Sequence, residues 1–181
     1  MVIWPEYRIY AKTVGFYEEY YEDGRKGTWV LDGKKKLFIA QPPHKIIDST
    51  LVGLGSSLVG AIRGSKLLLG KGCKMLPLTI NAQFGIFLLP TKAYGRHDCL
   101  WLSLMHIEKT EPLNGDGTRV YMSYGHVFDL EIKHCLFLRK MDKARRLREI
   151  VTRNAQQPFT FRLEPKAGLT IVEEEGEYRL K

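Results

Sequence analysis

The sequence lacks long apolar runs and contains few cysteines. No segment approaches ~18 uninterrupted apolar residues, the length that a membrane-spanning helix needs. The N-terminus lacks the basic segment and apolar run of a secretory signal. Cysteine occurs only at Cys73, Cys99 and Cys135, an odd and widely spaced set that fits a reducing compartment better than a disulfide scaffold. These absences predict a cytoplasmic protein that does not enter a membrane.

Acidic residues are missing from the whole interval between Asp48 and Asp98. They gather instead near the two ends of the chain, between Glu6 and Asp23 and between Glu173 and Glu177. The basic residues of the acid-free interval are Arg63, Lys66, Lys71, Lys74, Lys92 and Arg96. Two explanations stay open: a surface of one sign, or an apolar core segment in which acids would be absent anyway.

The overall charge is basic. The chain has 28 Lys+Arg against 20 Asp+Glu, a formal net charge of +8 that favours an anionic partner, either nucleic acid or an acidic membrane surface. Hydrophobic residues make up 44% of the 181 positions, enough to bury a core in one domain.

Strand patterns dominate the first half of the chain. Alternation predicts a strand over 7–12, and apolar runs at 28–31 and 36–39 predict a hairpin across Asp32-Gly33, because an Asp-Gly pair tolerates the positive φ angles of tight turns. Pro42-Pro43 is expected to end this unit.

One short helix and four further strands are predicted in the middle of the chain. The helix lies within 48–69 and is entered through Ser56-Ser57, with Leu58, Ile62 and Leu69 on its buried side. The predicted strands are 84–89, a central strand 100–109 that is apolar on both faces, and a second hairpin of 119–122 with 127–132.

A helix over 135–154 has the clearest pattern. Apolar residues recur every three or four positions, at Phe137, Met141, Ala144, Leu147 and Val151. The opposite side is basic, with Arg139, Lys143, Arg146 and Arg153. After this helix we expect a strand over 160–163 and an acidic tail over 167–181.

These elements predict an α+β fold: mixed, largely antiparallel β-structure with a short central helix and a basic amphipathic C-terminal helix. Residues 1–166 would form one domain. A basic amphipathic helix can also lie on a membrane, but its apolar stripe has one aromatic residue and strands flank it, so core packing and no membrane contact are expected.

Catalytic and cofactor motifs are incomplete. The glycines at 53–60 lack the lysine of a phosphate loop and the third glycine of a dinucleotide fingerprint. Neither Ser56 nor Ser57 has the flanking glycines of a nucleophile elbow, and no Cys-x-x-Cys pair suggests zinc. His106 is interpreted as a satisfied core histidine; its alternative is a hydrolase base acting with Ser103. We predict no enzyme, no metal and no cofactor.

The basic helix and the acid-free interval instead favour a polyphosphate partner. A helix that is apolar on one side can rest on the core and present cations to a phosphate backbone, and free N–H groups at a helix start can hold another phosphate. The predicted DNA contacts are Ser56, Ser57, Arg63, Lys66, Lys71, Lys74, Arg139, Lys143 and Arg146. The alternative is a protein-interaction module whose basic face binds an acidic partner.

Three ordered blocks resemble the ComK family: 55–60 (GSSLVG), 86–91 (IFLLPT) and 99–107 (CLWLSLMHI). The resemblance extends more weakly to 159–166 (FTFRLEPK), and covers about residues 5–166. The family pattern has basic residues directly after the first block, whereas Ala61-Ile62 precede Arg63 here.

The resemblance implies a nucleoid-associated transcriptional activator of competence (DNA-uptake) genes in Gram-positive bacteria. Such a protein binds paired A/T-rich boxes in double-stranded DNA as a homo-dimer or dimer pair, mainly through the minor groove and with DNA bending. It also implies control by a proteolytic adaptor. The residues that match the adaptor-recognised segment are Phe159, Phe161, Leu163, Pro165 and Lys166.

Overall fold

The computed structural model describes residues 3–21, 24–70, 74–156, 171–174 and 177–180. None of the helices in this part is long and apolar enough to cross a membrane alone. Two helices, α1 (Pro43–Gly53) and α2 (Leu58–Leu69), are bent by 86° at their junction and reach that length and apolarity only as a pair. The predicted strand over 160–163 lies outside the described residues.

Seven strands form the larger sheet, in the order β1-β4-β3-β2-β7-β6-β5. Their bounds are β1 Ile3–Trp4, β2 Thr13–Tyr20, β3 Lys26–Asp32, β4 Lys35–Ile39, β5 Leu78–Asn81, β6 Ile86–Pro90 and β7 Leu100–Ser103. Every neighbouring pair is antiparallel except β1 with β4, which is parallel. The predicted α+β class with mixed, largely antiparallel structure is confirmed.

The predicted strand over 100–109 is wrong as one element, although its first part is central as expected. β7 lies between β2 and β6 and is buried throughout. A 3-10 turn, η1 (Leu104–His106), then redirects the chain into β8 (Ile107–Leu113) of a smaller sheet. The turn is held because the Nε2–H of buried His106 donates to the Ala11 carbonyl at 2.7 Å.

The smaller sheet has the order β10-β9-β8. β9 (Gly117–Met122) and β10 (Val127–Leu130) form the predicted second hairpin, joined by η2 (Ser123–Gly125). A separate antiparallel pair, β11 (Ile171–Glu174) and β12 (Glu177–Leu180), follows near the C-terminus.

Two helices, not one, occupy the region predicted as a single helix over 48–69. α1 (Pro43–Gly53) begins at a proline in the first helical position, where the missing N–H is not needed. Gly55, at φ +75°, turns the chain before α2 (Leu58–Leu69). Pro42-Pro43 therefore starts a helix as well as ending the hairpin.

The predicted strand over 7–12 is also wrong; the strand begins at Thr13. Hydroxyl groups satisfy this backbone instead of a neighbouring strand: the Thr50 hydroxyl accepts from the Ile9 N–H, and the Thr13 hydroxyl from the Tyr10 N–H, both at 3.1 Å. The predicted hairpin is confirmed as β3–β4, but its central residues are Gly33 (φ +56°) and Lys34, one position later than the predicted pair Asp32-Gly33.

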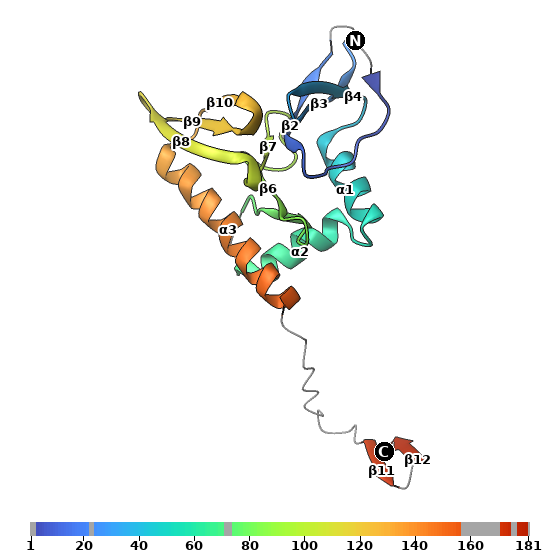
Figure 1. Ribbon diagram of the computed structural model, residues 1–181. Helices are drawn as coiled ribbons and strands as arrows, with labels where there is room; N and C mark the ends of the chain where they lie inside the picture. The colour runs from blue at the N-terminus through green and yellow to red at the C-terminus, as the bar shows by residue number, and fades with distance from the viewer. Residues whose placement is uncertain (1–2, 22–23, 71–73, 157–170, 175–176, 181) are drawn as a thin grey trace.

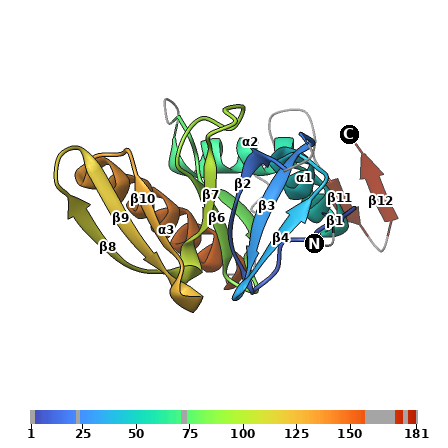
Figure 2. The ribbon, with the colours of Figure 1, turned by 90° about the horizontal axis from the view of Figure 1, so that it is seen from above.

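Two apolar clusters fill the two faces of the larger sheet. α1 packs on one face through Ile46, Ile47 and Leu51, and the second cluster joins the other face to α3 (His134–Gln156) and the smaller sheet. α2 contributes Leu58 to the first cluster and Leu69 to the second. Figures 1 and 2 show α3 running along the smaller sheet, and Figure 1 shows α2 extending from α1 toward α3. α2 therefore links the two halves of the core.

Candidate nucleic-acid interface

The inner face of α3 is anchored in the core, as its apolar stripe predicted. Phe137, Met141, Ala144 and Leu147 are buried, and Val151 is half-buried against the same cluster. The packing of these apolar side chains in the core fixes the rotation of the helix about its axis. Its opposite face is thereby held toward solvent.

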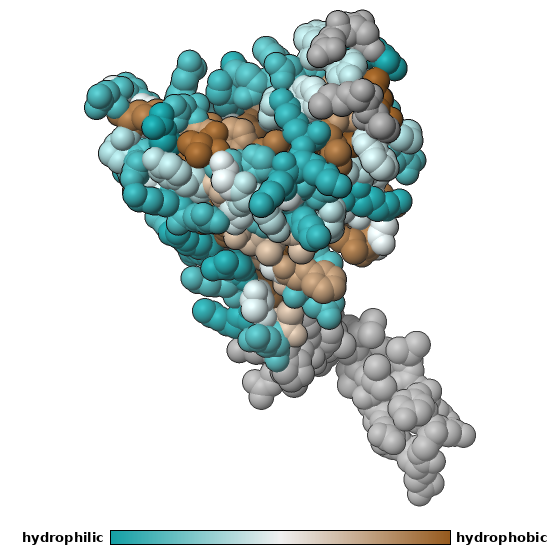
Figure 3. All heavy atoms as spheres, turned by 45° about the horizontal axis from the view of Figure 1, so that its top comes forward, coloured by the Kyte–Doolittle hydropathy of each residue, from teal (hydrophilic) through white to brown (hydrophobic). Residues whose placement is uncertain are grey.

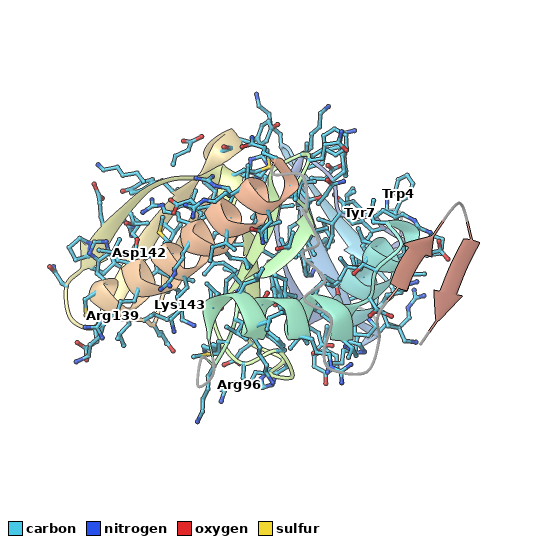
Figure 4. All side chains as sticks on the ribbon, turned by 90° about the horizontal axis from the view of Figure 1, so that it is seen from below. Trp4, Tyr7, Arg96, Arg139, Asp142 and Lys143 are labelled. Atoms are coloured by element: carbon cyan, nitrogen blue, oxygen red, sulfur yellow. The ribbon has the colours of Figure 1, made fainter. Side chains whose placement is uncertain are left out.

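The outer face of α3 presents three of the predicted contact residues on one line. Arg139, Lys143 and Arg146 follow one another at spacings of four and three, so they share one side of the helix. Arg139 and Arg146 are exposed and Lys143 is half-buried. Figure 4 shows Arg139 and Lys143 projecting from the same flank of the helix.

Few carboxylates neutralise this face. The nearest pair on the helix is Arg145 with Asp142, at 3.4 Å. Within the part of the chain that the structure describes, no carboxylate lies within ion-pair distance of Arg139, Lys143 or Arg146. Their charges are therefore available to an external anion.

The helix that carries two of the predicted contacts, α2, packs against α3. Arg63 and Lys66 are exposed and one turn apart. Lys74 is exposed beside Met75, whose sulfur accepts a hydrogen bond from Lys140 of α3 at 3.4 Å. The structure thus brings the 74–75 segment and the end of α2 to α3. Lys71 lies outside the described residues.

Ser57 and Ser56 differ in what they do at the start of α2. The Ser57 hydroxyl accepts from the Gly60 N–H at 3.1 Å, which makes Ser57 the N-cap. The Asp48 carboxylate accepts from the Leu58 N–H at 2.8 Å. A phosphate at this helix start would need backbone N–H groups, but those of Gly60 and Leu58 already donate within the protein, the second to a negatively charged carboxylate. Ser56 is exposed.

The last two basic residues of the acid-free interval contact an aspartate. Lys92 and Arg96 both contact the Asp98 carboxylate, at 2.6 and 2.8 Å. Hydrogen bonds from Arg96 and then Lys92 hold the pKa of Asp98 well below its usual range. The single Asp98 carboxylate offsets one of these two positive charges, so this group adds less to an anion-binding surface than two free cations would.

Sequence reasoning missed a second basic group, at the turns of the larger sheet. It consists of Lys12, Lys34, Lys35 and Lys36, all exposed. The Gly33 N–H donates to the Lys12 carbonyl at 2.9 Å, which joins the two turns, and the β3–β4 turn lies beside the β9–β10 turn in Figure 2. Three consecutive lysines beside a predicted hairpin turn were the signal in the sequence.

The hydrolase alternative finds no support in the geometry. His106 is 6% exposed and bonded to a backbone carbonyl, while the buried Ser103 hydroxyl has no partner among the described residues. Since the two side chains do not bond to each other, His106 cannot activate Ser103 as arranged. Among the described residues, no three His, Cys, Asp or Glu side chains are placed to hold a metal ion.

One face of the molecule is mostly polar. Figure 3 shows hydrophilic side chains over most of the face in view, with hydrophobic residues in small separate patches. The predicted adaptor-recognition residues lie outside the described residues. They are Phe159, Phe161, Leu163, Pro165 and Lys166.

Comparison with known proteins identifies the family. The ComK protein family matches residues 5–156. The competence transcription factor of Bacillus subtilis (strain 168) is 26% identical over 115 residues, which are 64% of this chain and 59% of that relative's own length. No solved structure matches the chain significantly. The family match covers well over half of the sequence, so the chain is a member of the ComK family.

Proposed function

We propose that this protein is a competence transcription factor that activates DNA-uptake genes by binding double-stranded DNA. The observation that carries the proposal is the outer face of α3, where Arg139, Lys143 and Arg146 are held toward solvent without carboxylate partners in the described structure. Cations on a rigid, core-anchored helix suit a phosphate backbone. Membership of the ComK family and the likeness to a competence transcription factor support the same reading.

The proposed target is a pair of A/T-rich boxes, read mainly in the minor groove. A narrow A·T groove concentrates negative potential and attracts Arg and Lys side chains. α2, which carries Arg63 and Lys66, packs against α3, and Lys74 is next to Met75, which contacts Lys140. We propose that these three residues extend the contact surface, together with Ser56. Ser57 would act there by fixing the start of α2.

Paired boxes imply a paired protein. We propose that the chain acts as a homo-dimer or dimer pair in the cytoplasm, on the nucleoid, with residues 1–166 as the DNA-binding domain and 167–181 as an acidic tail. The segment from Phe159 to Lys166 is proposed as the contact for a proteolytic adaptor.

Gel shifts on duplexes with two A/T boxes at varied spacing test this proposal. We expect tight binding only at spacings that place both boxes on one face of the duplex, because a dimer fixes the distance between its two contact surfaces. G/C-rich duplexes of equal length are the control. Equal, weak binding to A/T-rich and G/C-rich duplexes at every spacing would favour the alternative of a module for an acidic protein partner.

A further inference from the structure

A hollow of about 600 Å³ lies beside the first half of α3. Arg139, Lys140 and Lys143 line it from the helix, and Met75 and Thr91 line it from two loops of the larger sheet. Figure 4 shows two of these side chains, Arg139 and Lys143, on the flank that borders it. Three cations from consecutive turns of one helix therefore converge on one concave surface.

Lys140 is the unusual member of this set. Its ammonium group is partly withdrawn from water and has no carboxylate partner among the described residues. It donates to the Pro90 carbonyl at 3.3 Å and to the Met75 sulfur at 3.4 Å, two long bonds to weak or neutral acceptors. A partly buried cation without a counter-ion is costly. Burial, and then the nearby charge of Lys143, lower its pKa below that of an ordinary lysine.

The carboxylates on the far rim do not supply the missing counter-ion. Asp116 and Glu131 line that rim from the smaller sheet. Asp116 lies 3.2 Å from Lys133 and is neutralised there. Three cations thus face one remaining carboxylate, that of Glu131, and the hollow keeps a net positive charge.

The segment that brings Met75 to Lys140 adopts an unusual backbone conformation. Met75 has φ +50°, one of two positive φ angles at non-glycine residues in the described chain. Such a conformation is unfavourable in a residue with a Cβ. The surrounding structure maintains it, and it places a neutral sulfur, not an acid, against the ammonium group.

We propose that this hollow binds a phosphate group, with Lys140 at its floor and Arg139 and Lys143 at its rim. The inference deepens the proposed function and rests on it in one respect: the phosphate is taken to be a phosphodiester of the bound duplex. A phosphomonoester of a small molecule has the same chemistry, so the test separates the two. Lys140 was not among the contacts that the sequence predicted.

The test compares three variants of Lys140 with one control. Lys140→Gln keeps N–H donors for Pro90 and Met75 but removes the charge, Lys140→Met removes both, and Lys140→Arg keeps the charge. Arg148→Gln removes an equal charge from an exposed position of α3 outside the hollow. Each protein is titrated with pyrophosphate, followed by its melting midpoint at fixed ionic strength, and with an A/T-box duplex at several salt concentrations.

We expect pyrophosphate to raise the midpoint of the wild type and of Arg148→Gln, but not of Lys140→Gln or Lys140→Met. Duplex affinity of these two Lys140 variants should fall about tenfold, the size of one charge-assisted hydrogen bond. The negative slope of their log affinity against log salt should become less steep by about 0.9, the value for one phosphate contact. Lys140→Arg should keep most of the rise in melting midpoint with pyrophosphate and most of the duplex affinity. Without any anion, Lys140→Met should melt no lower than the wild type, because it removes an uncompensated charge.

Other results overturn the inference. If Lys140→Gln binds both probes like the wild type, Lys140 is only a structural link between Met75 and Pro90. The same conclusion follows if Lys140→Met melts lower without anion and Lys140→Gln restores both stability and binding. If wild-type protein binds pyrophosphate through Lys140 but binds no duplex, the hollow is a site for a free phosphorylated ligand; the proposed DNA function then fails while the phosphate site stands.

Discussion

Two adjacent serines have different roles: Ser57 stabilises the start of α2, and Ser56 is a proposed DNA contact. Ser57 caps α2 through the Gly60 N–H, whereas the hydroxyl of exposed Ser56 makes no such bond in the described structure. Ser57→Ala should lower the free energy of unfolding by about 1 kcal/mol, and Ser56→Ala by less than about 0.5 kcal/mol. Urea unfolding followed by circular dichroism measures both. Equal losses would mean that Ser57 is not the cap.

Asp98 gives a residue-scale prediction with a definite pH dependence. Its pKa is lowered in the folded protein by Arg96 and Lys92, so its ionised form stabilises the fold above the pKa of an unfolded aspartate. This contribution disappears as the pH falls through the folded pKa. Asp98→Asn should therefore melt slightly lower than the wild type at pH 7.

The difference between Asp98→Asn and the wild type should shrink as the pH falls below the ordinary aspartate range. Melting curves from pH 7 down to about pH 2, below the pKa of an unfolded aspartate, measure it. Added salt should reduce the difference as well, because the group is partly exposed. A difference that grew toward low pH would show that Asp98 does not contribute through its charge.

At the scale of the element, the two faces of α3 should respond to substitution in opposite ways. Leu147 is fully buried, so Leu147→Ala should lower the free energy of unfolding by roughly 2–5 kcal/mol. Arg146 lies one residue earlier and is exposed. Arg146→Ala should change stability by less than about 0.5 kcal/mol but weaken DNA binding.

Chemical denaturation and duplex titration of the same two variants check this separation. A strong stability loss on Arg146→Ala would place this side chain in the core. That result would contradict the assignment of DNA binding to the outer face of α3.

Elements with a strong local pattern could be predicted from the sequence. The apolar stripe of α3 repeats over five positions, which predicts a helix. The pair Asp32-Gly33 predicts the β3–β4 hairpin, because few residues other than glycine tolerate the φ of +56° found at Gly33. The run 100–109 is apolar on both faces, so nothing in it shows where the chain leaves one sheet for the other. Pro43 is compatible with ending a strand and with starting a helix.

The candidate site was predictable in its residue types but not in its pairing. The basic stripe of α3 follows from spacing alone. The pairing of Asp98 with both Lys92 and Arg96 depends on a loop conformation. The surroundings of Lys140 include Met75, 65 positions away in sequence. Long-range contacts of this kind leave no periodic signal in a single sequence.

At the scale of the whole molecule, two groups of basic residues in the described part of the chain are candidates for DNA contact. One is the α3 surface with the nearby ends of α2 and the 74–75 segment; the other is the turn group of Lys12 and Lys34–Lys36. General electrostatic attraction would use both groups alike, since a net charge of +8 draws DNA from any direction. A defined interface would use the α3 surface much more than the turns.

The salt dependence of duplex binding distinguishes these cases most directly. Two double variants remove the same charge: Lys143→Ala with Arg146→Ala on α3, and Lys34→Ala with Lys35→Ala at the turn. The slope of log affinity against log salt is negative, and each lost phosphate contact makes it less steep by about 0.9. The α3 variant should make it less steep by about 1.8 and weaken binding to the A/T-box duplex, while the turn variant stays near the wild-type slope. A wild-type slope in the α3 variant, or equal losses in both, would contradict the assignment of DNA binding to α3.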